Sequence, residues 1–288
     1  MALLDYVPTV SERLPVGYRL GPYRVKRFVA AGAVANVYEA ILEPINQTVA
    51  LKVIKAAGIV RSSAFRRFAR EAKMLAWLNH RNIVALIDAG REGDFVFLAM
   101  QYIAGGNLRD RIRKQGPLGL EESLSIITGV TAALRHAWRH RIVHRDIKPG
   151  NILLTSSGRP KLADLGLAKL MDVHPSLTPT GTRLGSAGYM APEQMRDSKS
   201  VDIRADVYAL GVVWFYCLTR RRPFAARRLS DLLRSIRTDP LPRLRDFAPG
   251  VPDWVQVCMD KMCAKEPADR FQDPSELLSY LAAHTAGA

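Results

Sequence analysis

The sequence predicts an α+β fold with two lobes, a small lobe of antiparallel β-strands with one main helix and a larger lobe made mostly of helices. Three observations predict it. Apolar and polar residues alternate over several segments between residues 23 and 100, which is the pattern of half-buried strands. Beyond residue 120 the apolar residues recur at helical spacing instead. Between these regions, Ala104-Gly105-Gly106 breaks both patterns, and we expect the lobe boundary there.

The expected elements follow in chain order. Residues 1–16 contain two prolines and no apolar periodicity, which predicts a weakly ordered N-terminal extension. Residues 17–103 are expected to form the first lobe, with one amphipathic helix over 62–78 and strands over 23–29, 37–41, 48–54, 83–88 and 95–100. Residues 104–288 are expected to form the second lobe of the same domain, with helices over about 121–140, 203–219, 229–237, 252–263 and 275–284.

The composition is that of an ordinary globular protein, since 48% of the 288 residues are hydrophobic and 24% are charged. The longest apolar run, residues 207–218, is shorter than the ~18 residues that suggest a membrane span. We therefore expect no membrane span in this chain. The N-terminus has no basic and apolar regions typical of a signal peptide. Together with three cysteines that form no CxxC pair, this predicts a cytoplasmic protein.

The net charge of +15 comes from 31 arginines and 11 lysines against 27 acidic residues. The densest basic stretch, residues 220–245, holds nine arginines and two aspartates. One interpretation is a docking surface for an acidic partner, such as an acidic protein, RNA or an anionic lipid. The other is a solvated face of an arginine-rich protein. The second is favoured because the run lacks the regularly interleaved aromatic residues on which bases stack.

Three short segments occur in a fixed order in the second half of the chain: His144-Arg145-Asp146-Ile147-Lys148-Pro149-Gly150-Asn151, then Asp164-Leu165-Gly166, then Ala191-Pro192-Glu193. An HRD triplet alone would be weak evidence for any function. The ordered set resembles the active-site half of a protein kinase, with its catalytic loop, metal-binding motif and APE segment.

The resemblance implies a role for each polar residue of these segments. Asp146 is expected to orient a substrate hydroxyl and to accept its proton, and Lys148 to neutralise charge on the phosphoryl group during transfer. Asn151 and Asp164 carry oxygen ligands of the kind that a phosphate-bound Mg²⁺ prefers. The implied catalytic residues are therefore Asp146, Lys148 and Asn151, and the implied metal ligands are Asn151 and Asp164.

The resemblance extends from about Tyr18 to Leu281 and is to the eukaryotic-like Ser/Thr protein kinases of bacteria. In Val49-Ala50-Leu51-Lys52 it implies that Lys52 binds the α- and β-phosphates of ATP. Glu71, on the expected helix, matches the acid that pairs with this lysine.

The adenine ring is expected between apolar side chains. The resemblance implies that Val37, Ala50 and Leu153 enclose it. Backbone groups of the hinge, at Gln101 and Ile103, are expected to hydrogen-bond its edge. Gln101 stands where the family usually has Glu, but the hinge uses main-chain atoms, so little should change.

The phosphate-covering loop departs from the family pattern. The usual G-x-G-x-x-G-x-V appears here as residues 30–37, in which Ala30 and Ala35 replace two glycines and only Gly32 remains. Glycine allows the backbone to approach phosphate closely and to adopt a positive φ. Alanine is the smallest alternative. We therefore expect Ala30 and Gly32 still to border the phosphates, with weaker or slower nucleotide handling rather than a blocked site.

Three residues suggest regulation. Arg145 precedes the catalytic Asp, an arrangement that in the family lets the arginine bind a phosphorylated activation loop. Thr178 and Thr180 lie where bacterial members carry autophosphorylated threonines, and a homodimer is one route to phosphorylation in trans. The alternative is that both threonines are ordinary residues of a turn-rich loop.

The resemblance also implies two supports in the second lobe: a buried ion pair between Glu193 and Arg270, and Asp206 holding the catalytic loop from below. The predicted activity is transfer of the γ-phosphate of Mg²⁺-ATP to Ser or Thr hydroxyls of protein substrates. The choice of Ser and Thr rests on Lys148 and on Ser186, where a Thr is usual.

Two other functions remain open. A pseudokinase would bind nucleotide or act as a scaffold, and the altered glycine loop favours it, whereas the intact Lys52, Glu71, Asp146, Asn151 and Asp164 oppose it. A small-molecule phosphotransferase on the same fold is disfavoured by the APE segment and by the peptide-facing residues 185–189.

Overall fold

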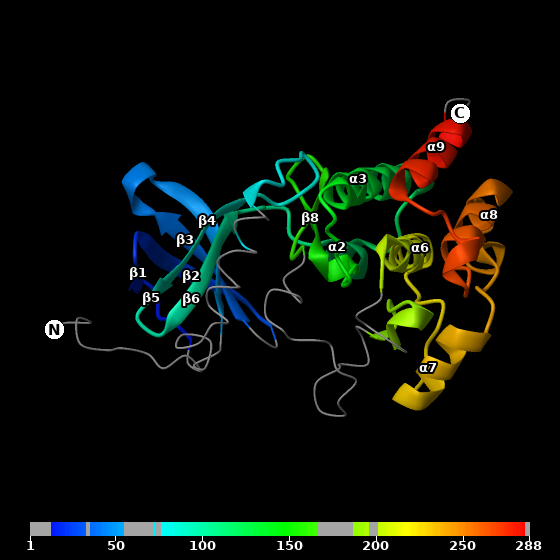
Figure 1. Cartoon of the computed structure of the whole chain (residues 1–288), viewed down its shortest axis with the longest axis horizontal. Coiled ribbons are helices and arrows are strands. Elements are labelled where there is room, and N and C mark those ends of the chain that lie inside the picture. The colour runs from blue at the N-terminus through cyan, green and yellow to red at the C-terminus, as the bar shows by residue number, and fades with distance from the viewer. Residues whose placement is uncertain are drawn as a thin grey trace. The chain divides into compact units, whose positions relative to one another are not determined.

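The computed structural model describes residues 13–32, 35–54, 72, 76–165, 187–195 and 201–285. The chain divides into two compact units, one of Met1–Asn79 with Val84–Ile103 and one of His80–Ile83 with Ala104–Ala288. The described part of the first unit is a β-sheet, and the second unit contains helices and a short β-hairpin (Figure 1). This is the predicted α+β class with an antiparallel sheet and a helical lobe.

The sheet has six antiparallel strands in the order β1-β2-β3-β4-β6-β5. The strands are β1 (Arg19–Leu20), β2 (Tyr23–Ala31), β3 (Ala35–Leu42), β4 (Gln47–Ile54), β5 (Leu86–Glu92) and β6 (Phe95–Gln101). Along β4 the apolar side chains alternate, so that Val49, Leu51 and Val53 are buried in the core of this unit. The residues between them, Ala50 and Lys52, therefore lie on the opposite face.

One predicted strand is displaced. The sequence predicts a strand over 83–88, whereas β5 covers Leu86–Glu92. Ile83 forms an isolated parallel bridge with Leu162 and belongs to the second unit. The apolar run is thus divided between two units, which periodicity alone does not reveal. The predicted helix over 62–78 lies almost entirely outside the described residues.

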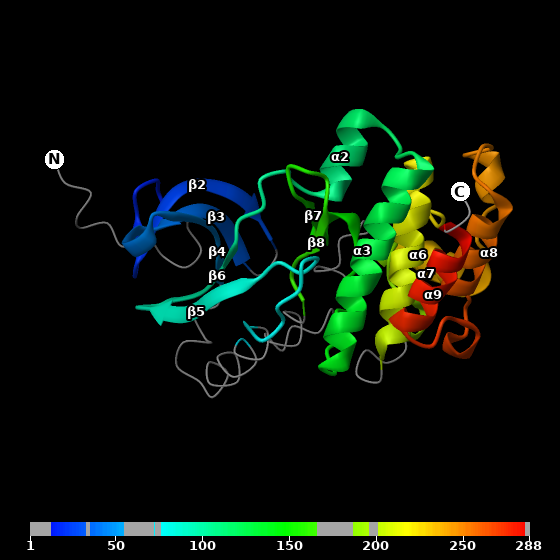
Figure 2. The same cartoon turned by 90° about the horizontal axis from the view of Figure 1, so that it is seen from above.

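The helices of the second unit lie where the periodicity predicts them, within one or two residues. They are α3 (Leu120–Arg139), α6 (Ile203–Thr219), α7 (Leu229–Thr238), α8 (Asp253–Met262) and α9 (Pro274–Thr285). α3 packs against both α6 and α9, and α8 packs on α6 (Figure 2). The apolar periodicity predicts neither α2 (Leu108–Gln115) nor the hairpin of β7 (Ile152–Leu154) and β8 (Pro160–Leu162).

α6 is the central helix of this unit. It is apolar on nearly every side and most of its side chains are buried, as expected of a helix surrounded by others. Gly211 permits a close crossing, because a Cβ at this position would lie 2.6 Å from Sγ of Cys263 and 2.9 Å from Cβ of Met262. The helix ends at Arg220, which adopts a left-handed φ of 58° where glycine is the common residue.

The glycine break predicted between the lobes has a structural basis. Gly106 has a φ of 76°, and its carbonyl accepts a hydrogen bond from the N–H of Leu154 at 2.9 Å. Gly105 approaches the carbonyls of Leu154 and Thr155 so closely that a side chain would not fit there. Over the described parts of the chain, every helix is too short or too polar to span a bilayer.

Candidate active site

The loop of residues 144–151, called the Asp146 loop below, is fixed from beneath by a single buried carboxylate. Asp206, on α6, is 1% exposed. Its two oxygens accept hydrogen bonds from the backbone N–H groups of His144 at 2.7 Å and Arg145 at 2.8 Å. Burial raises the pKa of Asp206, and the two N–H donors and the nearby His144 and Arg145 side chains act in the opposite direction. The prediction that Asp206 holds this loop is confirmed.

The imidazole of His144 links two parts of the site. Its Nδ1 accepts a hydrogen bond from the N–H of Asp146 at 3.2 Å, so the ring proton belongs on Nε2. Nε2 in turn donates to the carbonyl of Ala163 at 2.8 Å. The ring is buried, and it connects Asp146 to the residue that precedes Asp164.

The three predicted catalytic residues lie together. Nζ of Lys148 donates to both carboxylate oxygens of Asp146, at 2.9 and 2.7 Å. Nδ2 of Asn151 donates to the backbone carbonyl of Asp146 at 2.8 Å and to its Oδ2 at 3.0 Å. Asp146 is thereby held in one orientation by two side chains, while 44% of its own side chain stays exposed.

Asp164 is placed by the residue before it. The N–H of Ala163 donates to the carbonyl of Asn151 at 2.8 Å, which ties this segment to the Asp146 loop. Asp164 itself adopts a φ of 61°. A left-handed φ at a residue other than glycine costs of order 1–3 kcal/mol and persists where the surrounding structure imposes it.

The donor chemistry of this pair fits Mg²⁺. The Nδ2 of Asn151 is used by Asp146, so its Oδ1 is the atom of this side chain that can bind a cation. Asp164 adds a carboxylate, and hard oxygen ligands of this kind, completed by phosphate oxygens and water, are usual for Mg²⁺. Among the described residues, His, Cys, Asp and Glu side chains form no group of three or more that could hold a metal ion alone.

In the first unit, three of the predicted nucleotide-binding residues share one face of the sheet. Val37 on β3 is the direct cross-strand partner of Lys52 on β4, so their side chains are neighbours. Ala50 lies on the same face of β4. Glu71, the predicted partner of Lys52, lies outside the described residues.

The altered glycine loop is partly described. Ala30 is the cross-strand partner of Val37, at the end of β2. The N–H of Gly32 donates to the carbonyl of Ala35 at 2.8 Å, which turns the chain back into β3. Neither Ala30 nor Ala35 has a positive φ. Nothing in the backbone conformation at these two positions therefore requires glycine.

The predicted adenine contacts come from both units. At the end of β6, the N–H of Gln101 donates to the carbonyl of Ala85 at 2.9 Å. This N–H is therefore already used and is not the group expected to contact adenine. In the second unit, Leu153 is half-buried on β7 between the buried Ile152 and Leu154. That Gln101, Ile103 and Leu153 all contact the adenine ring of one ATP molecule stays a prediction.

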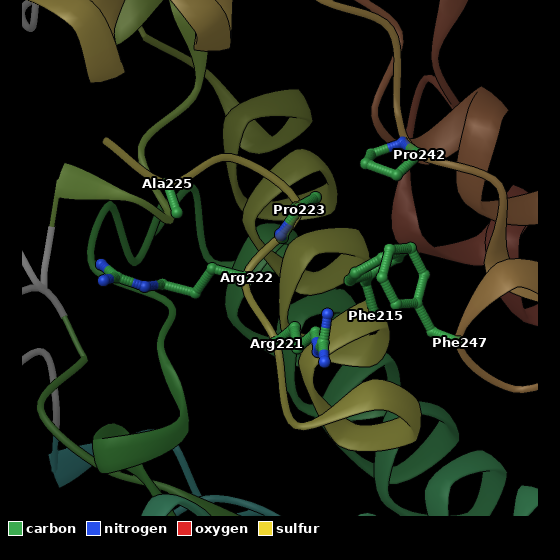
Figure 3. A pocket seen from close by; sticks show the side chains of 7 residues that line it. All are labelled: Phe215, Arg221, Arg222, Pro223, Ala225, Pro242 and Phe247. Atoms are coloured by element: carbon green, nitrogen blue, oxygen red, sulfur yellow. The ribbon is translucent and has the colours of Figure 1, made fainter. Parts of the chain in front are cut away.

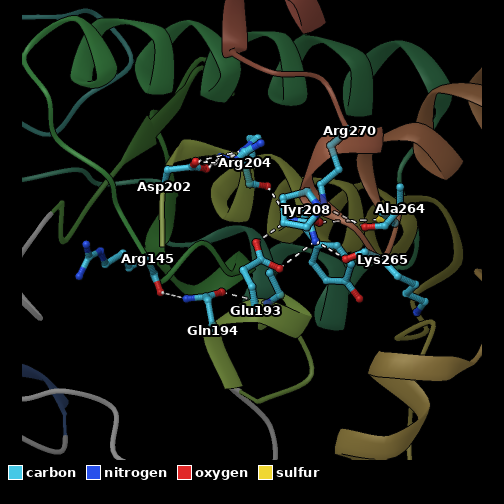
Figure 4. Close-up of polar contacts among 12 residues, drawn as sticks. Arg145, Glu193, Gln194, Asp202, Arg204, Tyr208, Ala264, Lys265 and Arg270 are labelled. Atoms are coloured by element: carbon cyan, nitrogen blue, oxygen red, sulfur yellow. Dashed lines mark hydrogen bonds and ion pairs between the residues drawn. The ribbon is translucent and has the colours of Figure 1, made fainter. Parts of the chain in front are cut away.

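Arg145 is fixed at its backbone on both sides. It has a φ of 67°, and its N–H donates to Asp206. Its carbonyl accepts a hydrogen bond from Nε2 of Gln194 at 3.2 Å (Figure 4). The guanidinium makes a long contact of 3.4 Å to the carbonyl of Val201. The predicted phosphorylation sites, Thr178 and Thr180, lie outside the described residues.

Sequence reasoning missed the role of Gln194. This side chain also accepts a hydrogen bond from the N–H of Ala191 at 2.9 Å, so it joins residues 187–195 to the Asp146 loop. It directly follows the Ala191-Pro192-Glu193 motif. The motif itself indicates a structured segment, but it does not tell which backbone group the glutamine contacts.

The predicted ion pair between Glu193 and Arg270 is confirmed. Two parallel hydrogen bonds of 2.6 and 2.8 Å join the guanidinium to the carboxylate (Figure 4). The side chain of Arg270 is 0% exposed. Its remaining N–H groups donate to the backbone carbonyls of Ala264, Arg204 and Lys265. The pair therefore joins residues 192–195 to α6 and to the segment after α8.

Comparisons with known proteins agree with this geometry. The family model described as "Protein kinase domain" matches residues 23–280. The chain is 35% identical to the serine/threonine-protein kinase PrkC of Bacillus subtilis over 264 residues, which are 91% of this chain and 40% of PrkC. It is 34% identical to the serine/threonine-protein kinase PknA of Mycobacterium tuberculosis over 273 residues, which are 93% of this chain and 62% of PknA.

Two solved structures share the fold. The kinase domain of Mycobacterium tuberculosis PknI, solved as a point mutant, has a TM-score of 0.72 and 28% identity, and the match covers 94% of this chain and 99% of that one. Rad53 1–466 in complex with AMP-PNP has a TM-score of 0.76 and 25% identity, covering 90% of this chain and 64% of that one. The chain spans about 40% of the length of PrkC and 62% of PknA. It belongs to the protein kinase domain family and is a homologue of the bacterial serine/threonine-protein kinases.

Proposed function

We propose that this chain is an active kinase that transfers the γ-phosphate of ATP to serine or threonine hydroxyls of protein substrates. One observation carries the proposal: Lys148 and Asn151 hold the carboxylate of Asp146 in a fixed orientation. The printed names of the bacterial relatives support the reaction class. The complex of Rad53 with AMP-PNP supports ATP as the phosphate donor.

In the proposed reaction, the substrate hydroxyl oxygen forms a bond to the γ-phosphorus while the bond from that phosphorus to the bridging oxygen of ADP breaks. Asp146 orients the hydroxyl and accepts its proton as the new bond forms. Lys148 donates to the oxygens of the transferring group and offsets their charge. When bound, Mg²⁺ supplies further electrostatic stabilisation of the phosphates, and Asn151 and Asp164 are the residues that would hold it.

The other residues bind the nucleotide. Lys52 would neutralise the α- and β-phosphates, with Glu71 as its partner, while Ala30 and Gly32 border them. Val37, Ala50 and Leu153 would contact the adenine faces, and the backbones of Gln101 and Ile103 its edge. We place the protein in the cytoplasm, because that compartment supplies ATP and keeps thiols reduced, and its three cysteines are buried, free thiols.

The experiment is an incubation of the purified protein with γ-labelled ATP and a generic Ser/Thr acceptor protein. Wild type should transfer label, and Asp146→Asn should reduce the rate by about 10²–10⁴-fold, the usual contribution of a positioned general base. Similar rates for both proteins would identify the activity as a contaminant. If wild type binds nucleotide but transfers nothing, the protein is a pseudokinase, the alternative that the altered glycine loop favours.

We also propose that activity rises when Thr178 and Thr180 become phosphorylated by a second copy of the chain. The supporting observation is Arg145, whose backbone is fixed by Asp206 and Gln194 and whose guanidinium could bind a phosphate. Peptide mapping by mass spectrometry after incubation with ATP tests it. An active enzyme with no phosphate between Met171 and Gly185 would disprove this mode of regulation, whereas a rate that depends on enzyme concentration would support transfer between two copies.

A further inference from the structure

An arginine that the proposed reaction does not use lies beside the Asp146 loop. Arg109 is exposed in the first turn of α2, and this helix packs against Pro149–Asn151. A Cβ placed on Gly150 would lie 3.8 Å from Nη1 of Arg109. The guanidinium is therefore next to Gly150, one residue before the Asn151 that binds Asp146.

A second arginine lies against the segment of residues 187–195. Arg222 follows the end of α6, and a Cβ placed on Gly188 would lie 3.1 Å from its Nη1 and 3.2 Å from its Cδ. Arg222 also lines a cavity of about 440 Å³, whose aromatic wall is formed by Phe215 and Phe247. Figure 3 shows that the side chain of Arg222 extends away from this aromatic wall, whereas Arg221 lies beside it.

Both arginines have an electrostatic effect on Tyr189, in the segment of residues 187–195. Its side chain is buried, and burial raises the pKa of its hydroxyl, whereas Arg222 and Arg109 both lower that pKa. Both guanidinium groups are thus close enough to Tyr189 to affect it electrostatically. The segment that carries Tyr189 is joined through Gln194 to the carbonyl of Arg145, the residue before Asp146.

The charge of Arg109 is only weakly compensated. Its Nε lies 3.5 Å from Oδ1 of Asp110, and both side chains are about half exposed, so this pair contributes little. Asp110 is also used by Asn107, whose side-chain amide donates to Oδ2 at 2.8 Å. A guanidinium has five N–H donors in a planar fork, so Arg109 retains donors for a further carboxylate. Position 150, between Arg109 and Asn151, carries no side chain at all.

We propose that Arg109 and Arg222 select protein substrates in which acidic residues flank the phosphorylated Ser or Thr. An extended peptide advances about 3.3 Å per residue, so a peptide whose acceptor lies at Asp146 carries its flanking side chains past the neighbouring segments, where Arg109 lies beside Gly150 and Arg222 beside Gly188. Asp or Glu at those positions forms charge-assisted hydrogen bonds with them. Lys or Arg there is repelled, which adds discrimination. This selection rests on the proposed function, since it concerns the peptide that the kinase would phosphorylate.

The test compares two peptides of equal length, each with one Thr, flanked by Glu in one peptide and by Lys in the other. Wild type should phosphorylate the Glu peptide with the higher kcat/KM. Arg109→Gln and Arg222→Gln should each lower kcat/KM for that peptide by roughly 2- to 5-fold, the usual effect of a partly exposed ion pair. The effect should fall on KM, because neither residue touches the reacting atoms. The control is Lys114→Gln in the last turn of α2, which also removes one positive charge. It should leave kcat/KM unchanged for both peptides.

A second variant shifts the preference without removing an arginine. Gly150 does not have a left-handed φ, and a Cβ there would be in ordinary contact with Arg109, so Gly150→Glu fits the backbone. The new carboxylate would pair with Arg109 and leave a negative charge near the acceptor site. The ratio of kcat/KM for the Glu peptide to kcat/KM for the Lys peptide should fall in Gly150→Glu, and Gly150→Ala should leave this ratio unchanged.

Binding without ATP separates this inference from the proposed function. Fluorescence anisotropy with labelled peptides should show tighter binding of the Glu peptide, and this preference should be reduced in Arg109→Gln and by added salt. An active enzyme that treats both peptides alike, or prefers the Lys peptide, overturns the inference and leaves the proposed function intact. A protein that transfers no phosphate overturns the proposed function, and equal affinity for both peptides then overturns the selection as well.

Discussion

Lys148 donates from one ammonium nitrogen to both carboxylate oxygens of Asp146, at 2.9 and 2.7 Å. The two side chains are 27% and 44% exposed, so the pair contributes little to the stability of the fold. Its effect is on geometry. A carboxylate held at both oxygens rotates less, and a general base must keep one oxygen directed at the proton that it removes.

The first prediction follows from this pair. Lys148→Met should lower kcat by about 10²–10³-fold, the loss usual for one group that stabilises charge in a transition state. Affinity for ATP should change little, because Lys148 is assigned to the transferring group rather than to the bound nucleotide. Steady-state kinetics and calorimetry with ATP measure the two quantities. Lys114→Met on α2 is the matched control. An equal loss of kcat in both variants would show that Lys148 has no specific role in phosphoryl transfer.

The second prediction concerns the metal. Asp164→Asn keeps the shape of the side chain but removes one negative charge from the predicted Mg²⁺ site. ATP affinity measured with Mg²⁺ should fall by roughly 10- to 100-fold, as is usual when a metal's ligand environment is disturbed. Affinity measured in excess EDTA should be the same as for wild type. A mutant that loses affinity equally in both conditions would show that Asp164 contacts the nucleotide rather than a metal ion.

The third prediction concerns stability. Arg270→Met should leave the carboxylate of Glu193 and three backbone carbonyls without their donor, which costs about 3–5 kcal/mol. For a domain of this size the Tm should fall by roughly 6–20 °C. Arg245→Met is the control, because Arg245 pairs with Asp253 at 2.8 Å on the exposed surface. That change should shift the Tm by less than about 4 °C. Similar Tm shifts in both variants would show that the buried pair of Arg270 contributes no more to stability than the exposed pair of Arg245.

The fourth prediction is a pH dependence of stability. His80 and His136 are stacked with ring centroids 5.1 Å apart. Burial lowers the pKa of both, helped by the charges of His136, Arg81, Arg135 and Lys161 on His80, and of His140 and Arg139 on His136. The unfolded chain therefore binds more protons than the folded one below the ordinary value of 6.5. The free energy of unfolding should therefore be independent of the protonation of these two histidines well above pH 6.5. It should decrease as the pH falls below that value, because protons then bind preferentially to the unfolded chain.

Melting curves between pH 8 and pH 5 measure this effect. His136→Phe keeps an aromatic ring against His80 and removes Nε2, a buried atom with no hydrogen-bond partner among the described residues. The loss of Tm on acidification should be smaller in this variant than in wild type. Identical pH profiles would assign the acid sensitivity to other groups.

The long helices of the second unit were predictable because their apolar periodicity extends over several turns and their ends carry local signals. α6 begins as predicted, after Asp202, whose carboxylate caps the helix through the N–H of Arg204. α2 was missed because it is short and charged, with Leu108 and Ile112 as its buried side chains. Its stability comes from packing against distant segments, which local periodicity does not record.

The same distinction applies to the site. Asp146, Lys148 and Asn151 are close in sequence, so a motif was enough to bring them together. Gln194 acts on Arg145 across 49 residues of sequence, and only the fold reveals this contact. Ala30 and Ala35 illustrate the reverse. The sequence indicated a departure from the family, and the structure adds that both alanines have ordinary φ values.

The anchoring of the Asp146 loop has a consequence for protein synthesis. The N–H of His144 is held by a carboxylate 62 residues further along the chain. A ribosome adds about 5–20 residues per second, so the loop exists for roughly 3–12 s before its anchor has been made. During that interval the nascent chain already contains every residue assigned to proton transfer. We expect it to be inactive nevertheless, because the backbone of the loop has no carboxylate to hold it until Asp206 has been made.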